Sequence, residues 1–205
     1  VSNTGVVATD TTGVGTARQR LAAAGYGGDK ALFGYGYTIQ NTTNLVSNTG
    51  VVASNTTGAG SARYDLAAAG YGGDKALFGY GFTGILVSTT NLVSNTGVVA
   101  SNSTGVGTPR QRLAAAGYGG DKAIFGYGFT TVSVTITNLV SNTGVVVSDI
   151  TNVGNEKSNI AAAGYGGDKA IFGGDAGYGT TNLVSNTGVV AADIANVGTK
   201  IRDYA

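Results

Sequence analysis

Hydrophobic and polar positions recur along the chain as short apolar runs separated by glycine-rich turns. Residues 66–71 (Leu-Ala-Ala-Ala-Gly-Tyr) are followed by a Gly-Gly-Asp turn at 72–74 and a second apolar run at 75–82. Three alanines favour a helix by propensity, but the run is too short and a glycine interrupts it. The pattern therefore predicts a β-hairpin, with Phe78 and Tyr80 on one face of its second strand.

A second hairpin is predicted at 44–54, where an Asn-Thr-Gly turn joins two β-branched runs. Both hairpins repeat. The first begins at residues 21, 66, 113 and 160. The turn glycine of the second falls at steps of 45, 47, 47 and 44 residues, at Gly5, Gly50, Gly97, Gly144 and Gly188. Such a period determines the architecture, because each unit is too small to bury a core by itself.

Four short antiparallel strands in a period of about 45 residues are typical of a β-propeller blade. We therefore expect one all-β domain over 1–205, with repeats at 1–44, 45–91, 92–138 and 139–182 and a partial repeat at 183–205. The alanine-rich strand suits the crowded innermost position, and the strand glycines leave room for aromatic rings of the adjoining unit.

We expect about five blades, the fifth being a composite of the N-terminal hairpin and the C-terminal segment. Two alternatives remain open. One has four blades and an extra hairpin. The other is an incomplete ring, completed by another chain or by residues outside this sequence. The absence of methionine leads us to expect a processed chain or a segment of a longer protein.

Two stretches resemble kelch-type propellers. Thr108-Pro109-Arg110 is similar to the kelch entry to the inner strand, and 171–174 (Ile-Phe-Gly-Gly) is similar to the kelch strand that ends in a glycine pair. The kelch tryptophan is absent. Two strings recur in the near-identical units, Asn-Leu-Val-Ser-Asn-Thr-Gly-Val-Val and Gly-Tyr-Gly-Gly-Asp-Lys-Ala. With these strings the units also resemble repeat segments of marine phage virion and tail-associated proteins. This second resemblance implies a virion-associated or extracellular location and brings no catalytic motif.

Composition narrows the function classes. Hydrophobic residues make up 42% of the chain and recur in register, so its 36 glycines do not imply disorder. The net charge is +1 without a run of like charge, and we expect neither nucleic acid nor a membrane as partner. No apolar run is long enough to span a bilayer.

Histidine and cysteine are absent. The usual general base, thiol nucleophile and transition-metal ligands are therefore missing. We expect a protein that is not an enzyme and has no catalytic residues, cofactor or metal site. An Asp-dependent glycosidase is the remaining enzymatic alternative.

The copies differ in two places, and strand order predicts that both emerge on one face. One is the loop between the hairpins, and the other is the entry to the inner strand. Binding residues commonly lie on such loops; drift of unconstrained loops is the alternative. Arginines there could hold an anionic group such as a sialic acid or phosphate, or tie loops to backbone carbonyls. Tyrosines there could stack on sugar rings, whereas those at 35, 80 and 127 suit packing between blades. The candidate ligand-binding residues are Arg18, Arg20, Tyr37, Arg63, Tyr64, Arg110, Arg112 and Tyr178.

We therefore expect a non-enzymatic propeller that recognises a surface glycan or a protein through its variable face. The alternative is an architectural module that self-associates through its unpaired terminal hairpin. The Asp-Lys pairs of the inner turns, such as Asp74-Lys75, are expected to serve solubility and turn geometry.

Overall fold

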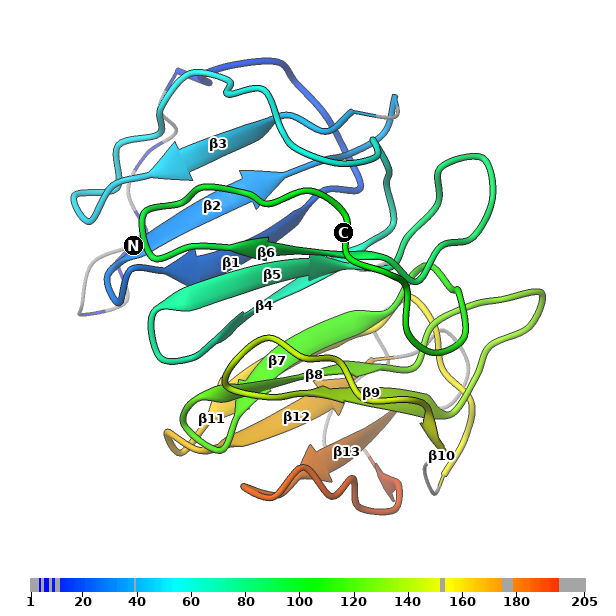
Figure 1. Cartoon of the computed structure of the whole chain (residues 1–205). Coiled ribbons are helices and arrows are strands. Elements are labelled where there is room, and N and C mark those ends of the chain that lie inside the picture. Colours follow the sequence, from blue (N-terminus) through cyan, green and yellow to red (C-terminus); the bar gives the residue numbers. More distant parts are fainter. Residues whose placement is uncertain are drawn as a thin grey trace.

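The fold is all-β, as predicted. The computed structural model describes residues 4, 6–7, 9, 12–38, 40–151, 154–174 and 179–195. These residues form four antiparallel sheets and no helix, and the sheets follow one another in chain order (Figure 1). Of the segments expected to build a fifth unit, the N-terminal hairpin (1–9) and the C-terminal segment (183–205), residues 1–3, 5, 8 and 196–205 lie outside the described residues.

Each sheet begins with the predicted inner hairpin. Sheet 1 contains β1 (Ala22–Tyr26), β2 (Lys30–Gly34) and β3 (Thr43–Val46). Sheet 2 contains β4 (Ala67–Tyr71), β5 (Lys75–Gly79) and β6 (Thr90–Val93). Sheet 3 contains β7 (Ala114–Tyr118), β8 (Lys122–Gly126), β9 (Ile136–Val140) and β10 (Ile150–Thr151). Sheet 4 contains β11 (Ala161–Tyr165), β12 (Lys169–Gly173), β13 (Thr180–Val184) and β14 (Ile194–Ala195).

The register of the inner hairpin is the same in all four sheets. In sheet 2, Ala67 pairs with Gly79 and Tyr71 pairs with Lys75. The turn between them contains Gly72 at φ 63°, a conformation that glycine adopts without steric cost. The predicted outermost strand is shorter than expected: it has two residues in sheets 3 and 4, and in sheets 1 and 2 isolated bridges stand in its place.

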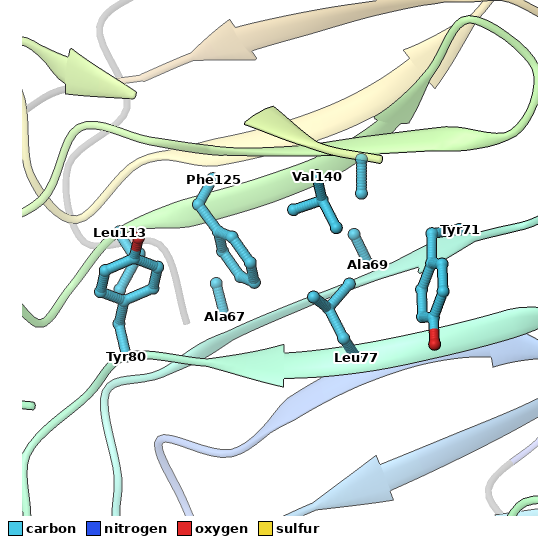
Figure 2. Packing of buried hydrophobic residues seen from close by; sticks show 9 residues of the cluster. Ala67, Ala69, Tyr71, Leu77, Tyr80, Leu113, Phe125 and Val140 are labelled. Carbon is cyan, nitrogen blue, oxygen red and sulfur yellow. The ribbon is translucent and has the colours of Figure 1, made fainter. Parts of the chain in front are cut away.

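The hydrophobic core lies between neighbouring sheets. Figure 2 shows Phe125 and Val140 of sheet 3 beside Ala67, Ala69 and Leu77 of sheet 2, and all five are buried. The alanines keep the inner strand thin, so that the aromatic side chain of the next sheet can fill the space. Burying one phenylalanine in this way contributes about 1.5–3 kcal/mol.

The expectation that Phe78 and Tyr80 share a face is wrong. Phe78 packs with the residues of sheet 1, whereas Tyr80 packs with Phe125 of sheet 3. Strand β5 ends at Gly79, and Tyr80 follows at φ 63°. This left-handed residue interrupts the alternation of a strand and turns the ring to the other face.

The expectation that strand glycines accommodate aromatic rings is confirmed. A Cβ atom on Gly34 would lie 2.5 Å from Cζ of Phe78, and one on Gly79 would lie 2.5 Å from Cζ of Phe125. The same tight relationship joins Gly126 to Phe172. In each of sheets 1, 2 and 3, a strand glycine therefore leaves room on the backbone for the phenylalanine ring of the following sheet.

The first strands of the four sheets are neighbours in series: β1 contacts β4, β4 contacts β7, and β7 contacts β11. Backbone hydrogen bonds join the sheets, for example from Gly27 N to Asp74 O (2.6 Å) and from Gly72 N to Asp121 O (2.6 Å). At this end all four inner strands line an open cavity of about 580 Å³.

Candidate functional site

At the start of the inner strands, four residues at one repeat position lie in the left-handed region. They have φ of 53–56° and are Arg20, Asp65, Arg112 and Asn159. Backbone hydrogen bonds join them in series: Asp65 N donates to Arg20 O (3.2 Å), Arg112 N to Asp65 O (2.9 Å), and Asn159 N to Arg112 O (3.0 Å). A non-glycine residue in this region costs on the order of 1 kcal/mol, which the surrounding structure must offset. We call these four residues the entry row.

Asp65 lies between the two arginines of the entry row. Its Oδ2 is 3.5 Å from Arg20 Nη1 and 3.7 Å from Arg112 Nε. Both guanidinium groups remain partly exposed, so each ion pair contributes less than about 1 kcal/mol. A guanidinium has five N–H donors, and one contact with Asp65 leaves others directed to solvent or to a ligand.

Aromatic side chains adjoin the entry row. Tyr37 and Tyr64 meet edge to face, with ring centroids 5.2 Å apart, and Tyr64 is 5.6 Å from Phe82. The Arg20 guanidinium lies 5.4 Å from the Tyr37 ring and 5.6 Å from the Tyr64 ring, within the range of a cation–π contact. Tyr37 is 43% exposed. Tyr37, Tyr64 and Phe82 thus form a group of aromatic side chains with the Arg20 guanidinium beside it, which we call the aromatic surface.

Backbone pairing explains how residues from different loops meet here. Gln19 forms a bridge with Tyr37, and Tyr64 forms a bridge with Phe82. Each bridge joins the entry to an inner strand with the start of the loop that leaves the same hairpin. The two variable segments are therefore neighbours, as strand order predicts.

Two predicted arginines are fully buried between sheets. Arg63 Nη2 donates to Asn91 Oδ1 (2.6 Å), and its guanidinium stacks on Tyr35 at 4.4 Å. Arg110 Nε donates to Tyr127 O (2.7 Å), and its guanidinium stacks on Tyr80 at 4.2 Å. Burial lowers the pKa of both arginines. Their contacts join adjacent sheets, as in the alternative in which arginines tie loops to the backbone.

Of the other two predicted residues, only Arg18 is described, and it lies apart from the aromatic surface. Arg18 is half-buried, and its guanidinium donates to Thr42 O (3.1 Å) and to the Asn44 side-chain oxygen. Tyr178 lies outside the described residues. The structure thus brings together four of the eight predicted residues, Arg20, Tyr37, Tyr64 and Arg112, and keeps Arg18, Arg63 and Arg110 apart from them.

The sequence prediction missed Asp65, Phe82, Phe129 and Asn159. Arg112 lies over the Phe129 ring at 5.5 Å, which repeats the relationship of Arg20 to Tyr37. Asp65 and Asn159 were detectable, because they occupy the repeat position of Arg20 and Arg112. Phe82 and Phe129 were detectable in the same way, because they occupy the repeat position of Tyr37.

The cavity lined by the four inner strands lies at their other end. Each turn lysine there contacts the aspartate that precedes it, as in Lys75–Asp74 at 2.9 Å. Hydrogen bonds from Lys75 and Asn95 lower the pKa of Asp74. Because every lysine is matched by its own carboxylate, the turns offer no uncompensated charge to a ligand.

Within the described residues, no group of three or more Asp or Glu side chains could hold a metal ion. No described segment forms a helix long and apolar enough to cross a membrane. The sequence matches no protein-family model, and it has no significant similarity to a curated protein.

Proposed function

We propose that the chain is a non-enzymatic β-propeller module that binds an acidic glycan at the Arg20, Tyr37, Tyr64 and Arg112 surface. The observation that carries this proposal is the contact of the Arg20 guanidinium with exposed Tyr37 and half-buried Tyr64, in segments that vary among otherwise near-identical repeats. Variation confined to one end of a constant scaffold is typical of a binding surface.

The propeller part of the proposal is supported by the arrangement of the inner strands. Each alanine-rich strand is first in its sheet and adjoins the equivalent strand of the next sheet. All four strands line one cavity. In a propeller the innermost strands occupy this position around a central channel.

The chemistry of the surface favours a sugar with a carboxylate or sulfate group. Tyrosine rings offer flat, amphipathic contact area at a low cost in conformational entropy. Arg20 and Arg112 offer planar pairs of donors that match a carboxylate. Apolar faces with a few convergent polar groups are the usual composition of a small-molecule site.

An array of sialylated, sulfated and neutral glycans tests the proposal. We expect the wild-type chain to bind acidic glycans, and Tyr64→Ala and Arg20→Ala to lose at least tenfold in affinity. Lys30→Ala is the matched control, because it removes one exposed cation from the opposite end of the sheets. The proposal fails if the folded protein binds no acidic glycan, or if Tyr64→Ala binds as well as Lys30→Ala.

A further inference from the structure

The two ends of the series of sheets carry the two halves of one interface. The chain contains this interface three times, between sheets 1 and 2, sheets 2 and 3, and sheets 3 and 4. We call the side of a sheet that meets the following sheet its front face, and the side that meets the preceding sheet its back face. Sheet 4 has no following sheet among the described residues, and sheet 1 has no preceding one.

The front face of sheet 4 is exposed where its counterparts are buried. Tyr165 is 40% exposed, whereas the equivalent Tyr71 and Tyr118 are each 4% exposed. The alanines of β11 that point the same way, Ala161 and Ala163, are also exposed. Their equivalents in β4 and β7 are covered by the next sheet.

An unfilled aromatic site accompanies this exposed face. Gly34, Gly79 and Gly126 each lie against a phenylalanine ring of the following sheet. Gly173 is their equivalent in sheet 4, and among the described residues a Cβ atom there would meet only the Thr181 methyl group, at 3.3 Å. Sheet 4 therefore has the glycine position that accepts a phenylalanine ring, but no ring of the described residues lies against it.

The back face of sheet 1 presents the complementary parts. Phe33 is 38% exposed, whereas its equivalents Phe78 and Phe125 are fully buried. Gly50 has no atom within 4 Å of a built Cβ among the described residues, whereas the equivalent Gly97 would meet Leu45 Cδ2 at 2.9 Å and Tyr26 Cε2 at 3.1 Å. The back face of sheet 1 therefore presents both the Phe33 ring, of the kind that fills a glycine site, and the Gly50 turn, of the kind that covers a tyrosine.

The backbone hydrogen bonds between sheets end at the same two faces. In this series Gly27, Gly72 and Gly119 donate to the aspartate carbonyl of the following turn, at 2.6–2.7 Å. Gly166 holds the next donor position in sheet 4, and Asp29 holds the first acceptor position in sheet 1. The series of hydrogen bonds and the series of apolar contacts between sheets therefore both stop at these two faces.

We propose that the front face of sheet 4 binds the back face of sheet 1 of a second copy of this chain. In this contact Phe33 of one copy lies over Gly173 of the other, the Gly50 turn covers Tyr165, and Gly166 N donates to Asp29 O. Both faces are exposed at once in a single chain, so they do not cover each other within it. The contact is heterologous and joins the copies head to tail.

One substitution makes this joint weaker than the internal interfaces. Tyr35, Tyr80 and Tyr127 each meet the phenylalanine of the following sheet edge to face, with centroids 5.0–5.3 Å apart. Gly174 stands at this repeat position in sheet 4, so the joint lacks that aromatic pair, which contributes about 0.5–1.5 kcal/mol elsewhere. A reversible, concentration-dependent association follows.

Sedimentation velocity of the full chain from 1 to 200 µM, on the order of the range that reveals a reversible contact, tests the proposal with two variants. Phe33→Ala removes the ring from the back face, and Gly173→Leu fills the site on the front face. Gly173 lies in a strand outside the positive-φ region, so leucine is conformationally acceptable there. Ile85→Ala, at an exposed loop residue, is the control, and circular dichroism shows that each variant is folded.

We expect the wild type and Ile85→Ala to associate with increasing concentration, and each face variant alone to remain monomeric. Phe33→Ala keeps an intact front face and Gly173→Leu an intact back face, so an equimolar mixture should form a one-to-one complex. A wild type that stays monomeric, a face variant that associates like the wild type, or a mixture that forms no complex overturns the proposal. Neither substitution touches the glycan surface, so this result is independent of the glycan test.

Discussion

The ring of Phe172 lies over the Cα of Gly126, so that a Cβ atom on that glycine would come within 2.7 Å of Cε1 and 2.9 Å of Cε2. This contact joins sheet 4 to sheet 3, and its equivalents join the other sheets. Glycine inside a strand ordinarily weakens it. Here the missing side chain is what allows neighbouring sheets to approach.

The first prediction concerns this contact. Gly126→Ala should lower the free energy of unfolding by about 1–3 kcal/mol, because the added methyl group overpacks a buried ring that cannot move away. Gly173→Ala is the matched control, since it makes the same change in sheet 4, where the Thr181 methyl group is the one near neighbour in the described part of the chain. Urea unfolding of both variants measures the difference, and equal effects would contradict this account of the interface.

The second prediction concerns alkaline pH. Burial raises the pKa of Tyr80 to about 12, although the nearby Arg110 opposes this shift. The folded state therefore favours the neutral phenol more strongly than the unfolded chain does, because a tyrosine in the unfolded chain titrates near 10. This stabilisation is complete below pH 10 and is lost as the pH rises to about 12, by roughly 2–3 kcal/mol for this residue.

Urea unfolding between pH 8 and 12 measures this loss. Tyr80→Phe removes the titrating group and should flatten the decline. The substitution should not abolish the decline, because burial also raises the pKa of Tyr35 and Tyr127. Tyr80→Phe should also lose about 1 kcal/mol at neutral pH, with the hydrogen bond to Val106 O (3.2 Å). A decline with the same slope in the variant and the wild type would show that Tyr80 is not responsible.

The third prediction concerns the buried cation of sheet 4. Lys157 is fully buried, and its Nζ lies 2.6 Å from Asp193 Oδ1. Burial raises the pKa of Asp193, but hydrogen bonds from Lys157, the Asn155 N–H and Asn182 outweigh this effect and leave the pKa lowered. Lys157→Ala should destabilise the fold by about 2–4 kcal/mol, because it removes the charge that compensates the Asp193 carboxylate.

Lys157→Arg is the matched control for that loss. Arginine occupies this repeat position in sheets 2 and 3, as Arg63 and Arg110, where it is equally buried. We therefore expect Lys157→Arg to retain most of the stability in thermal unfolding. If it unfolds as early as Lys157→Ala, the position needs more than a buried cation.

The fourth prediction concerns Asp65, which contacts both arginines of the entry row and would compete with the proposed acidic ligand for them. Asp65→Asn should bind acidic glycans more tightly, by a few-fold, because it removes a carboxylate that repels the ligand and occupies guanidinium donors. Stability should change by less than about 1 kcal/mol, since both ion pairs are partly exposed. Titration calorimetry at two salt concentrations measures the gain, and weaker binding of acidic glycans would contradict it.

The repeated pattern was sufficient to predict much of the fold. Glycine turns and apolar runs predicted the hairpins, and recurrence predicted that aromatic rings would pack against strand glycines, as Phe78 does on Gly34. Alternation failed at Tyr80, because a left-handed residue is not visible as a break in hydrophobicity. The outermost strands were predicted too long, since the valines there form only isolated bridges in sheets 1 and 2.

The site was less predictable than the fold. Comparison of the repeats located its variable segments, and it identified Arg20, Tyr37, Tyr64 and Arg112. It could not separate Arg20 from Arg63, which are two positions apart in the repeat. One guanidinium lies at the surface and the other is buried on the ring of the preceding sheet. That distinction depends on the neighbouring sheet, which a single repeat does not describe.

The proposal of an acidic-glycan surface is tested most directly by saturation-transfer difference NMR with a sialylated oligosaccharide. The account predicts transfer from the wild-type protein to the sugar protons, and loss of that transfer in the folded Tyr37→Ala/Tyr64→Ala double variant. Absence of transfer from the folded wild type, or equal transfer from the double variant, would contradict it.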